Sequence, residues 1–494
     1  MLTDFIGYSR VCLTNNNERR ENIMSELFNH ANLHAGLTEN GAVNHLSSMS
    51  ALVDFYKAAG SSRNSTEALP NLFYKALRED VDVAVRILLH MRDAREGMGE
   101  RKAFRTVMTE AIRTNMIDEF QVLRIMDKIS ELGRFDDFKI FVGTRYETDA
   151  FKHIEQGLLN PDTSALAAKW LPRVKKRHMD FVKRFCKFAN LSQKEYRLML
   201  SVLSDTVEQK ISANSFGEID YSKLPSLAAA RYQKLFTRKG GERYAEYVKA
   251  LSEGTEKINA GAVYPYDITK SVRYGRADVA NEQWKALPNW MRDGENILCM
   301  ADVSDSMTWE KHGSVTALDI GVSLALYVAE RNTGCFKDEL MVYSTRPYFI
   351  SLSGSLETRI RQVMKNVEYG STNIQAAFDR ILEIGVKNNL TQEAMPSKLI
   401  IFSDMQFNQV DGQRGNTNFE EIRRKYKESG YEMPQLVFWY LANRGGNCEV
   451  SVKDNGVAMV SGFSPATLKA LLGGEKFDPI SVMLKAVMSE RYDW

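Results

Sequence analysis

The period at which apolar residues recur changes near Trp290, and this change constrains the fold more than any other feature of the chain. Between about 20 and 290, apolar residues recur at every third or fourth position, as in L-F-Y-K-A-L at 72–77. Such a period predicts amphipathic helices, and tight-turn signals such as Gly240-Gly241 separate them. We therefore expect paired helices packed on their neighbours, as a HEAT-like repeat ring or solenoid or as an irregular helical domain.

After Trp290, short apolar runs alternate with amphipathic segments. The runs, typical of strands buried on both faces, lie at 296–301, 339–343, 397–402 and 435–441. The segments between them predict helices over 317–331, 356–367, 373–386 and 419–429. This alternation favours a doubly wound parallel sheet with helices on both faces. The predicted fold is multidomain α plus α/β, with a helical-repeat domain over 1–290 and an α/β domain over 291–494. The Y-P-Y-D-I segment at 264–268 predicts a rigid extended connector whose tyrosines pack on the second domain.

Length and composition are those of a globular protein without a membrane anchor. The 494 residues exceed what one hydrophobic core supports. The N-terminus lacks the pattern of a secretory signal, and no apolar run approaches the ~20 residues of a membrane span. Five scattered cysteines without a C-x-x-C pair give no sign of a zinc or redox centre. We expect a cytoplasmic, monomeric protein that does not bind membranes.

Positive charge is concentrated in the middle of the chain. The whole chain carries a formal charge of +2, but residues 165–290 alone carry +10, whereas 1–164 and 291–494 each carry −4. Since a local basic excess attracts polyanions, the middle third is the candidate nucleic-acid surface.

Small oxygen-bearing side chains gather where predicted strands end. D-V-S-D-S at 302–306 follows the first strand, Thr372 precedes a predicted helix, and Asp404 follows the strand at 397–402. Because ligands bind at the carboxyl ends of strands in such sheets, these loops are expected to converge. Carboxylates and hydroxyls without His or Cys suit Mg²⁺, or Mn²⁺ or Ca²⁺. The alternative is that D-V-S-D-S only caps a helix.

D-V-S-D-S-M, G-S-T-N and F-S-D together resemble the metal-ion-dependent adhesion site of von Willebrand factor A domains. The resemblance implies that Ser304, Ser306 and Thr372 bind the cation directly, and that Asp302 and Asp404 act mostly through water. Asp305 departs from the usual pattern, in which this position is often glycine; we interpret it as a solvated neighbour.

Segments of the helical part resemble an uncharacterised family related to the Ro ribonucleoproteins with their TROVE module. They are M-R-D-A-R-E-G-M-G-E-R-K at 91–102, L-G-R-F-D-D-F at 132–138, A-A-K-W-L-P-R at 167–173, L-P-S-L-A-A-A-R-Y at 224–232 and N-A-G-A-V-Y-P-Y-D-I at 259–268. In Ro proteins a ring of paired helices is closed by an A domain and binds noncoding RNA and the single-stranded ends of misfolded RNA. The resemblance therefore implies an RNA partner, although fold likeness alone does not transfer function.

Two basic segments are the candidate RNA contacts. The stretch 169–187 contains eight Lys or Arg and one Asp, and 237–243 is expected to be a basic loop offering backbone N–H groups. The candidate residues are Lys169, Arg173, Lys175, Lys176, Arg177, Lys183, Arg184, Lys187, Arg238, Lys239 and Arg243. On one helix Lys176, Lys183, Arg184 and Lys187 would share a side, and the alternative to RNA binding is that this side is a solvated helix face. The aromatic residues Phe181, Phe185 and Phe188 have helical spacing, which favours core packing over base stacking.

Two function hypotheses remain. The first is a Ro-like RNA-binding protein whose metal-binding A domain closes the ring or recruits partners. The second is a metal-dependent protein adaptor, in which an acidic residue of a partner completes the coordination of the cation. Catalysis is not expected, because no P-loop, H-E-x-x-H or nucleophile elbow is present.

Overall fold

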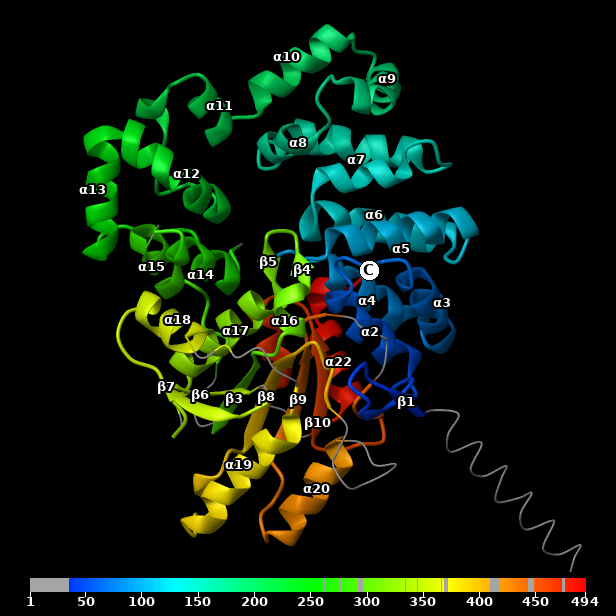
Figure 1. The fold of residues 1–494 in the computed structure, drawn as a ribbon. Coiled ribbons are helices and arrows are strands. Elements are labelled where there is room, and N and C mark those ends of the chain that lie inside the picture. Colours follow the sequence, from blue (N-terminus) through cyan, green and yellow to red (C-terminus); the bar gives the residue numbers. More distant parts are fainter. Residues whose placement is uncertain are drawn as a thin grey trace, which may run out of the picture.

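The computed structural model describes residues 35–261, 263–275, 277–291, 296–333, 335–343, 345–365, 367, 372–408, 418–442, 448–472 and 476–494. In this part of the chain, helices form an arc that leaves an α/β domain and returns to it (Figure 1). The helices of the arc are α2 (Ala51–Ser61), α3 (Leu69–Glu79), α4 (Val81–Arg92), α5 (Arg101–Thr114), α6 (Glu119–Leu132), η1 (Phe135–Phe141), α7 (Glu147–Leu159), α8 (Ser164–Trp170), η2 (Lys176–His178), α9 (Met179–Phe188), α10 (Gln193–Leu203), α11 (Val207–Ser212), η3 (Phe216–Glu218), α12 (Ser226–Lys239), α13 (Gly241–Ser252), α14 (Pro265–Arg273) and α15 (Ala277–Lys285).

Side chains at the helix ends explain where several of these helices begin. The Asp80 carboxylate accepts the backbone N–H of Val83 at 3.0 Å and caps α4. Asp118 and Gln121 form a reciprocal capping box at the start of α6. These side chains satisfy backbone donors that the first turn of a helix leaves unbonded.

The α/β domain has a six-stranded sheet in the order β10-β9-β8-β3-β6-β7. Its strands are β3 (Ile297–Asp302), β6 (Glu339–Tyr343), β7 (Tyr348–Ser351), β8 (Lys398–Ser403), β9 (Gln435–Tyr440) and β10 (Val457–Ser461). Smaller strands are β1 (Ala35–Leu37), β2 (Val43–His45), β4 (Lys311–His312) and β5 (Val315–Thr316). Its helices are α16 (Ser306–Trp309), α17 (Ala317–Arg331), α18 (Leu356–Met364), α19 (Ile374–Lys387), η4 (Gln392–Ala394), α20 (Asn418–Glu428), η5 (Pro465–Thr467), α21 (Leu468–Leu471), α22 (Pro479–Val487) and η6 (Glu490–Tyr492).

The sheet is mixed rather than purely parallel, which corrects one expectation. The four predicted apolar runs form β3, β6, β8 and β9, and these pair in parallel. The sequence reading missed β10, which adds a parallel edge, and β7, which pairs antiparallel with β6. An antiparallel edge strand needs only a short connection, so no intervening helix announces it in the sequence.

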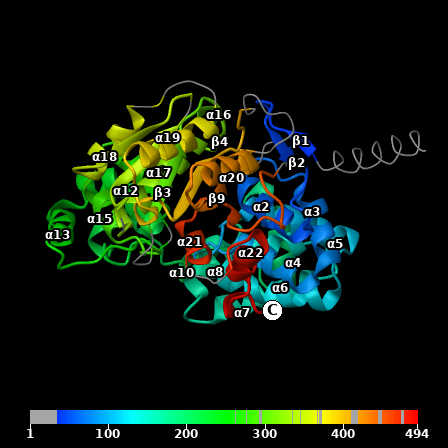
Figure 2. The same cartoon turned by 90° about the horizontal axis from the view of Figure 1, so that it is seen from below.

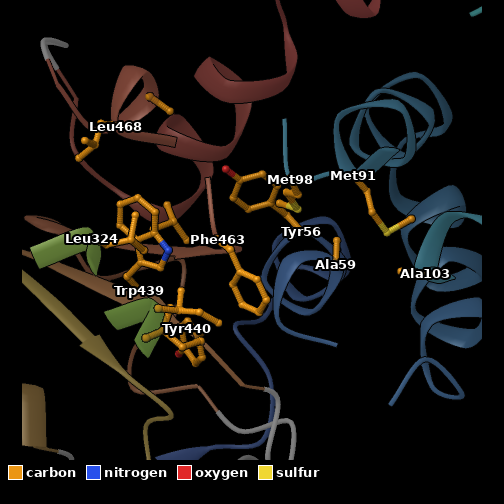
Figure 3. Packing of buried hydrophobic residues seen from close by; sticks show 14 of the residues in the cluster. Tyr56, Ala59, Met91, Met98, Ala103, Leu324, Trp439, Tyr440, Phe463 and Leu468 are labelled. Carbon is orange, nitrogen blue, oxygen red and sulfur yellow. The ribbon is translucent and has the colours of Figure 1, made fainter. Parts of the chain in front are cut away.

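The start of the arc shares one hydrophobic core with the sheet. Helix α2 packs on the edge strand β10, where the N–H of Gly60 donates to the Ser461 hydroxyl at 3.1 Å. A Cβ at Gly60 would lie 2.6 Å from the backbone nitrogen of Gly462, so only glycine allows this approach. Figure 3 shows Tyr56 of α2 and Met98 close to Phe463 and Trp439 of the α/β domain.

The end of the arc returns to the same domain. Helix α14 packs on α17, with an ion pair of 2.5 Å between Arg273 and Asp319. Tyr264 is half-buried and Tyr266 is buried, but residues 265–268 form the first turn of α14, so this segment is helical and not the extended connector that was predicted. Tyr266 lies against Phe463, and Tyr264 approaches Gly99 at the start of the arc. The two ends of the helical arc therefore meet each other and the α/β domain (Figures 1 and 2).

The first described residues belong with the α/β domain rather than with the helices, which departs from the helical pattern expected across 1–290. Strands β1 and β2 form an antiparallel hairpin. Its turn residue Gly41 bridges to Asn408, and His45 bridges to Cys448. The hairpin is thus an additional edge of the second domain, formed from three-residue strands too short to give a periodic signal.

The far side of the arc has a hydrophobic core of its own. Buried residues between Val207 and Leu251, together with Val279, form a cluster separate from the main core. Tyr221, Phe236 and Tyr244 are its centre, with ring centroids 4.9–5.6 Å apart. Among the described helices, none is both long enough and apolar enough to cross a lipid bilayer.

Candidate metal centre and nucleic-acid surface

The predicted oxygen side chains lie at the carboxyl edge of two neighbouring strands. Asp302 ends β3, Asp404 directly follows β8, and these strands pair in parallel. Ser306 begins α16, so the loop 303–305 carries Ser304 and leads Ser306 back toward the sheet edge. The hydroxyl oxygens of Ser304 and Ser306 are 3.2 Å apart. Four of the five predicted ligands thus come from two loops that start side by side.

Thr372, the fifth predicted ligand, lies against the loop that follows Asp404. It precedes α19 and is 1% exposed, and its backbone carbonyl accepts the N–H of Asn408 at 2.9 Å. Residues 369–371, the first part of the predicted Y-G-S-T-N loop, lie outside the described residues. The third loop therefore reaches the same sheet edge through its described residue.

The Asp302 carboxyl is poorly suited to carry a charge without a cation. Burial and, after it, the neighbouring Asp404 carboxylate raise its pKa to about 7. Hydrogen bonds from the Ser304 N–H at 2.9 Å and the Ser403 hydroxyl at 2.5 Å oppose this shift. Two buried carboxyls that disfavour each other's ionised form are an arrangement that a divalent cation relieves.

The donor set fits a hard divalent cation. Asp302 and Asp404 are each 1% exposed, and the five predicted side chains carry only carboxyl and hydroxyl oxygens. No group of three or more His, Cys, Asp or Glu side chains that could hold a metal ion occurs among the described residues. Oxygen ligands of this kind match Mg²⁺, Mn²⁺ or Ca²⁺ and not zinc.

Sequence reasoning missed two groups beside this centre. Ser403 bonds Asp302 and also accepts the N–H of Met405 at 2.9 Å. Burial raises the pKa of the Tyr343 hydroxyl, and the charge of Asp302 adds to this effect. Ser403 could have been identified from the sequence, because it immediately precedes Asp404 in F-S-D. Tyr343 could not, because its only distinguishing feature is that it ends a strand.

The loop after Asp404 is held by the β1–β2 hairpin. The Thr38 hydroxyl donates to the Phe407 carbonyl at 2.7 Å, and the Asn40 amide donates to the Gln406 carbonyl at 2.6 Å. Met405 has a φ of 61°, a left-handed conformation that is uncommon for a residue other than glycine. Contacts 366 to 369 residues apart in the sequence thus fix the backbone beside a candidate metal ligand.

The predicted RNA-contact residues divide into exposed cations and cations already engaged within the protein. Exposed ones are Lys175, Lys176, Arg177, Lys183, Lys187, Arg238 and Lys239. Engaged ones are Lys169, which pairs with Glu208 at 3.4 Å; Arg173, which donates to the Ser204 hydroxyl at 3.1 Å; Arg184, which pairs with Asp180 at 3.0 Å; and Arg243, which donates to the backbone carbonyls of Gly217 and Ile219.

Two details of the basic segments differ from expectation. The segment 237–243 is the last turn of α12 and the first of α13, and the Gly240 N–H is bonded to the Phe236 carbonyl, so it is not an open loop. Lys176 lies in η2 and not on α9 with the other basic residues. Phe181 and Phe185 are buried and pack on Phe151, which confirms the core interpretation of these aromatics.

A larger basic cluster surrounds Asp136 and Asp137 in η1. Asp137 pairs with Arg92 at 2.7 Å and Arg105 at 2.6 Å, and Asp136 pairs with Arg134 at 2.8 Å. Arg92, Arg101, Arg105, Arg134 and Lys139 interact with this centre or with one another. Lys175 and Arg177 adjoin them through His178, on which both act together with Lys139. We call these seven cations and two carboxylates the η1 cluster. The cluster connects the predicted basic residues of η2 with arginines of α5, and the sequence analysis did not identify those arginines as candidates.

Mutual repulsion within the η1 cluster is visible in its pKa values. Burial lowers the pKa of Arg101, and the charges of Arg134 and Arg105 lower it further. Burial likewise lowers the pKa of Lys139, with Arg105, Arg134 and Arg101 acting in the same direction. Burial and then Lys139 lower the pKa of His178. A group of cations that repel one another binds an anion favourably, because the anion relieves the repulsion.

Trp170 closes one side of this cluster. The Arg134 guanidinium lies 3.6 Å from the centroid of the Trp170 ring, and Lys169 lies 5.5 Å from it. Stacking holds the planar guanidinium in one orientation while its other edge bonds Asp136. The segments 132–138 and 167–173, quoted above for their resemblance to the Ro-related family, are thus brought into contact.

Comparisons with known proteins give matches to two family models, one viral protein and one solved structure. Residues 296–492 match a domain of unknown function (DUF7788), and residues 38–109 with 172–297 match another domain of unknown function (DUF2828). A protein of Acanthamoeba polyphaga mimivirus, "Uncharacterized protein L728", is 27% identical over 501 residues, covering 90% of this chain and 86% of that protein. The crystal structure of the Deinococcus radiodurans Ro (RSR) protein is similar over 90% of this chain and 100% of its own, with a TM-score of 0.38 and 12% identity.

Proposed function

We propose that this chain is a Ro-like RNA-binding protein that holds structured or single-stranded noncoding RNA on the basic surface of its helical arc. The observation that carries the proposal is the η1 cluster, which holds seven cations and only two carboxylates. Such an excess suits a polyanion, and the exposed Lys175 and Arg177 extend it toward solvent. The sequence resemblance to the Ro-related family supports the same partner.

The α/β domain, in this proposal, is of the von Willebrand factor A type. It binds Mg²⁺ through Ser304, Ser306 and Thr372, with Asp302 and Asp404 acting mostly through water. The bound cation supplies an open coordination position for an oxygen ligand. The protein side chains hold the cation and orient its loops, and the domain joins the two ends of the arc. The activity is binding and not catalysis.

A salt titration tests the RNA proposal. Fluorescence anisotropy of a labelled RNA hairpin with a single-stranded tail is measured with the full chain between 50 and 400 mM KCl. We expect the logarithm of the association constant to fall linearly with the logarithm of salt, because phosphate contacts release counterions. The double variant Lys175→Gln, Arg177→Gln is expected to weaken binding and to make this slope shallower by about 1.5, since each phosphate contact contributes about 0.7–0.9.

The matched control is Lys387→Gln, which removes an exposed charge of α19 in the α/β domain. It is expected to change neither affinity nor slope. Absence of binding at 50 mM KCl, or equal effects of the double variant and the control, would contradict the RNA proposal.

A second candidate function is a metal-dependent adaptor, favoured by the hydroxyl-rich centre at the sheet edge. A cation held mainly by neutral hydroxyls keeps enough positive charge to take a carboxylate from a partner protein. This candidate predicts that Asp302→Ala abolishes capture of partners that are retained in MgCl₂ and released by EDTA, while RNA affinity is unchanged. Equal capture by wild type and Asp302→Ala would argue against it.

A further inference from the structure

A groove between α3 and α5 adjoins the η1 cluster. Its volume is about 1280 Å³, above the range of about 300–1,000 Å³ typical of small-molecule pockets. One wall is the α3 face with Pro70, Asn71 and Tyr74, and the other is formed by α5 and the residues that follow it. The groove therefore has room for an extended ligand rather than a single small molecule.

Cations line the groove at the first turns of α5. Arg101 and Arg105 are one helical turn apart, so they share a face, and Lys102 lies beside them. Arg105 bonds both carboxylates of the η1 cluster, at 2.6 Å to Asp137 and 3.0 Å to Asp136. The groove and the η1 cluster thus have Arg101 and Arg105 in common. Positive charge is therefore continuous between them, and an anionic chain can contact both.

Two carboxylates also line the groove and limit where phosphates can lie. Glu110 is paired with Arg113 at 2.5 Å, so its charge is balanced within α5. Glu67 is exposed and accepts the Ser65 hydroxyl at 3.3 Å. Phosphates are therefore favoured near Arg101 and Arg105 rather than along the whole groove.

The other groups of the groove suit nucleobases. Tyr74 is 44% exposed and offers a ring on the α3 wall. Asn71, Thr109 and Asn115 place amides and a hydroxyl on the lining, where they can donate and accept hydrogen bonds. An aromatic ring beside arginines is the combination with which proteins bind unpaired nucleotides, because every base has a face that can stack.

We propose that this groove binds a segment of single-stranded RNA, with phosphates on Arg101 and Arg105 and a base stacked on Tyr74. The inference rests on the proposed RNA-binding function and adds the class of RNA and the place where it lies. Duplex RNA does not fit this arrangement, because its bases are paired and stacked on one another.

The test measures binding of labelled oligouridylate and of an RNA duplex to the full chain by fluorescence anisotropy. Tyr74→Ala is expected to weaken oligouridylate binding about 5- to 150-fold, the range found when a stacking aromatic is removed, and to leave duplex binding unchanged. Tyr74→Phe keeps the ring and is expected to bind as tightly as wild type. Arg101→Gln is expected to weaken binding and to reduce the salt slope by about 0.7.

Tyr274→Ala is the matched control, because Tyr274 is 64% exposed at the end of α14 and does not line the groove. If wild type binds RNA but Tyr74→Ala weakens oligouridylate binding no more than Tyr274→Ala, the groove proposal is wrong and the proposed function stands. If Tyr74→Phe loses as much affinity as Tyr74→Ala, base stacking is refuted. If the wild type binds neither oligouridylate nor the RNA duplex, both the groove proposal and the proposed function are refuted.

Discussion

Replacing Asp137 by asparagine is expected to destabilise the fold strongly while barely changing its shape. Asp137 is fully buried, and its carboxylate accepts hydrogen bonds from Arg92 at 2.8 Å, from Arg105 at 2.6 Å and from the backbone N–H of Arg134 at 3.0 Å. Arg92 is only 3% exposed. The amide has the size of the carboxylate but leaves the Arg92 guanidinium buried without its counter-charge.

The expected loss in free energy of unfolding is about 3–5 kcal/mol, the range measured when one partner of a buried ion pair is removed. An independent estimate agrees, since two charges about 4 Å apart at an effective dielectric constant of 20 interact by about 4 kcal/mol. Against a total stability of about 5–15 kcal/mol, this loss is large. It is measured by urea denaturation, followed by far-ultraviolet circular dichroism.

Two further variants decide whether the buried charge is the cause. Glu110→Gln breaks an exposed pair with Arg113, whose side chain is 68% exposed, and is expected to leave the urea midpoint unchanged. Arg92→Gln combined with Asp137→Asn removes both buried charges and is expected to be more stable than Asp137→Asn alone. A loss below about 1 kcal/mol for Asp137→Asn, or no recovery in the double variant, would refute the reasoning.

Three other predictions concern the metal centre, a buried carboxyl and the closure of the arc. MgCl₂ is expected to raise the midpoint of thermal unfolding in wild type but not in Asp302→Asn, because a cation bound only to the folded state stabilises it; equal shifts in both would contradict the metal assignment. Burial raises the pKa of Glu449 to about 7, so the wild type loses stability as pH rises from about 4.5 to 7, and Glu449→Gln is expected to gain stability relative to wild type between pH 5 and 8 in urea titrations; a constant difference between the two proteins would disprove it. Gly99→Ala is expected to lose about 2–4 kcal/mol in the same assay, because φ is +71° and the new Cβ would collide with the Tyr264 hydroxyl; a neutral effect would show that the two ends of the arc do not meet there.

The apolar pattern predicted those helices and strands whose own residues carry a clear period. The helix expected over 317–331 is α17, and the strand expected over 339–343 is β6, with the same bounds. The strand-end rule also placed Asp302 and Asp404 at one sheet edge, because neighbouring parallel strands end together. The cation itself stays a prediction.

Contacts between distant segments were beyond a sequence reading. The η1 cluster joins Arg92 of α4 to Asp137 and sets Arg101 of α5 beside Arg134, and no local pattern marks these positions as neighbours. The basic run at 169–187 was noticed because many charges lie close together in the sequence. A single arginine in an ordinary helix gives no such signal. The β1–β2 hairpin was missed because its strands are too short to give a periodic signal, and its contact with the loop after β8 spans more than 360 residues.

The C-terminal residues have a consequence for synthesis of the chain on the ribosome. Arg491 and Tyr492 bond Asp93 at 2.6 and 2.9 Å, although about 400 residues separate them. Translation at about 5–20 residues per second takes about 20–80 s to reach these partners. During that time Asp93 and the α4 surface next to it lack their final neighbours, and a chain truncated near its end never supplies them. Residues made about 400 positions later are therefore needed to finish the packing around Asp93.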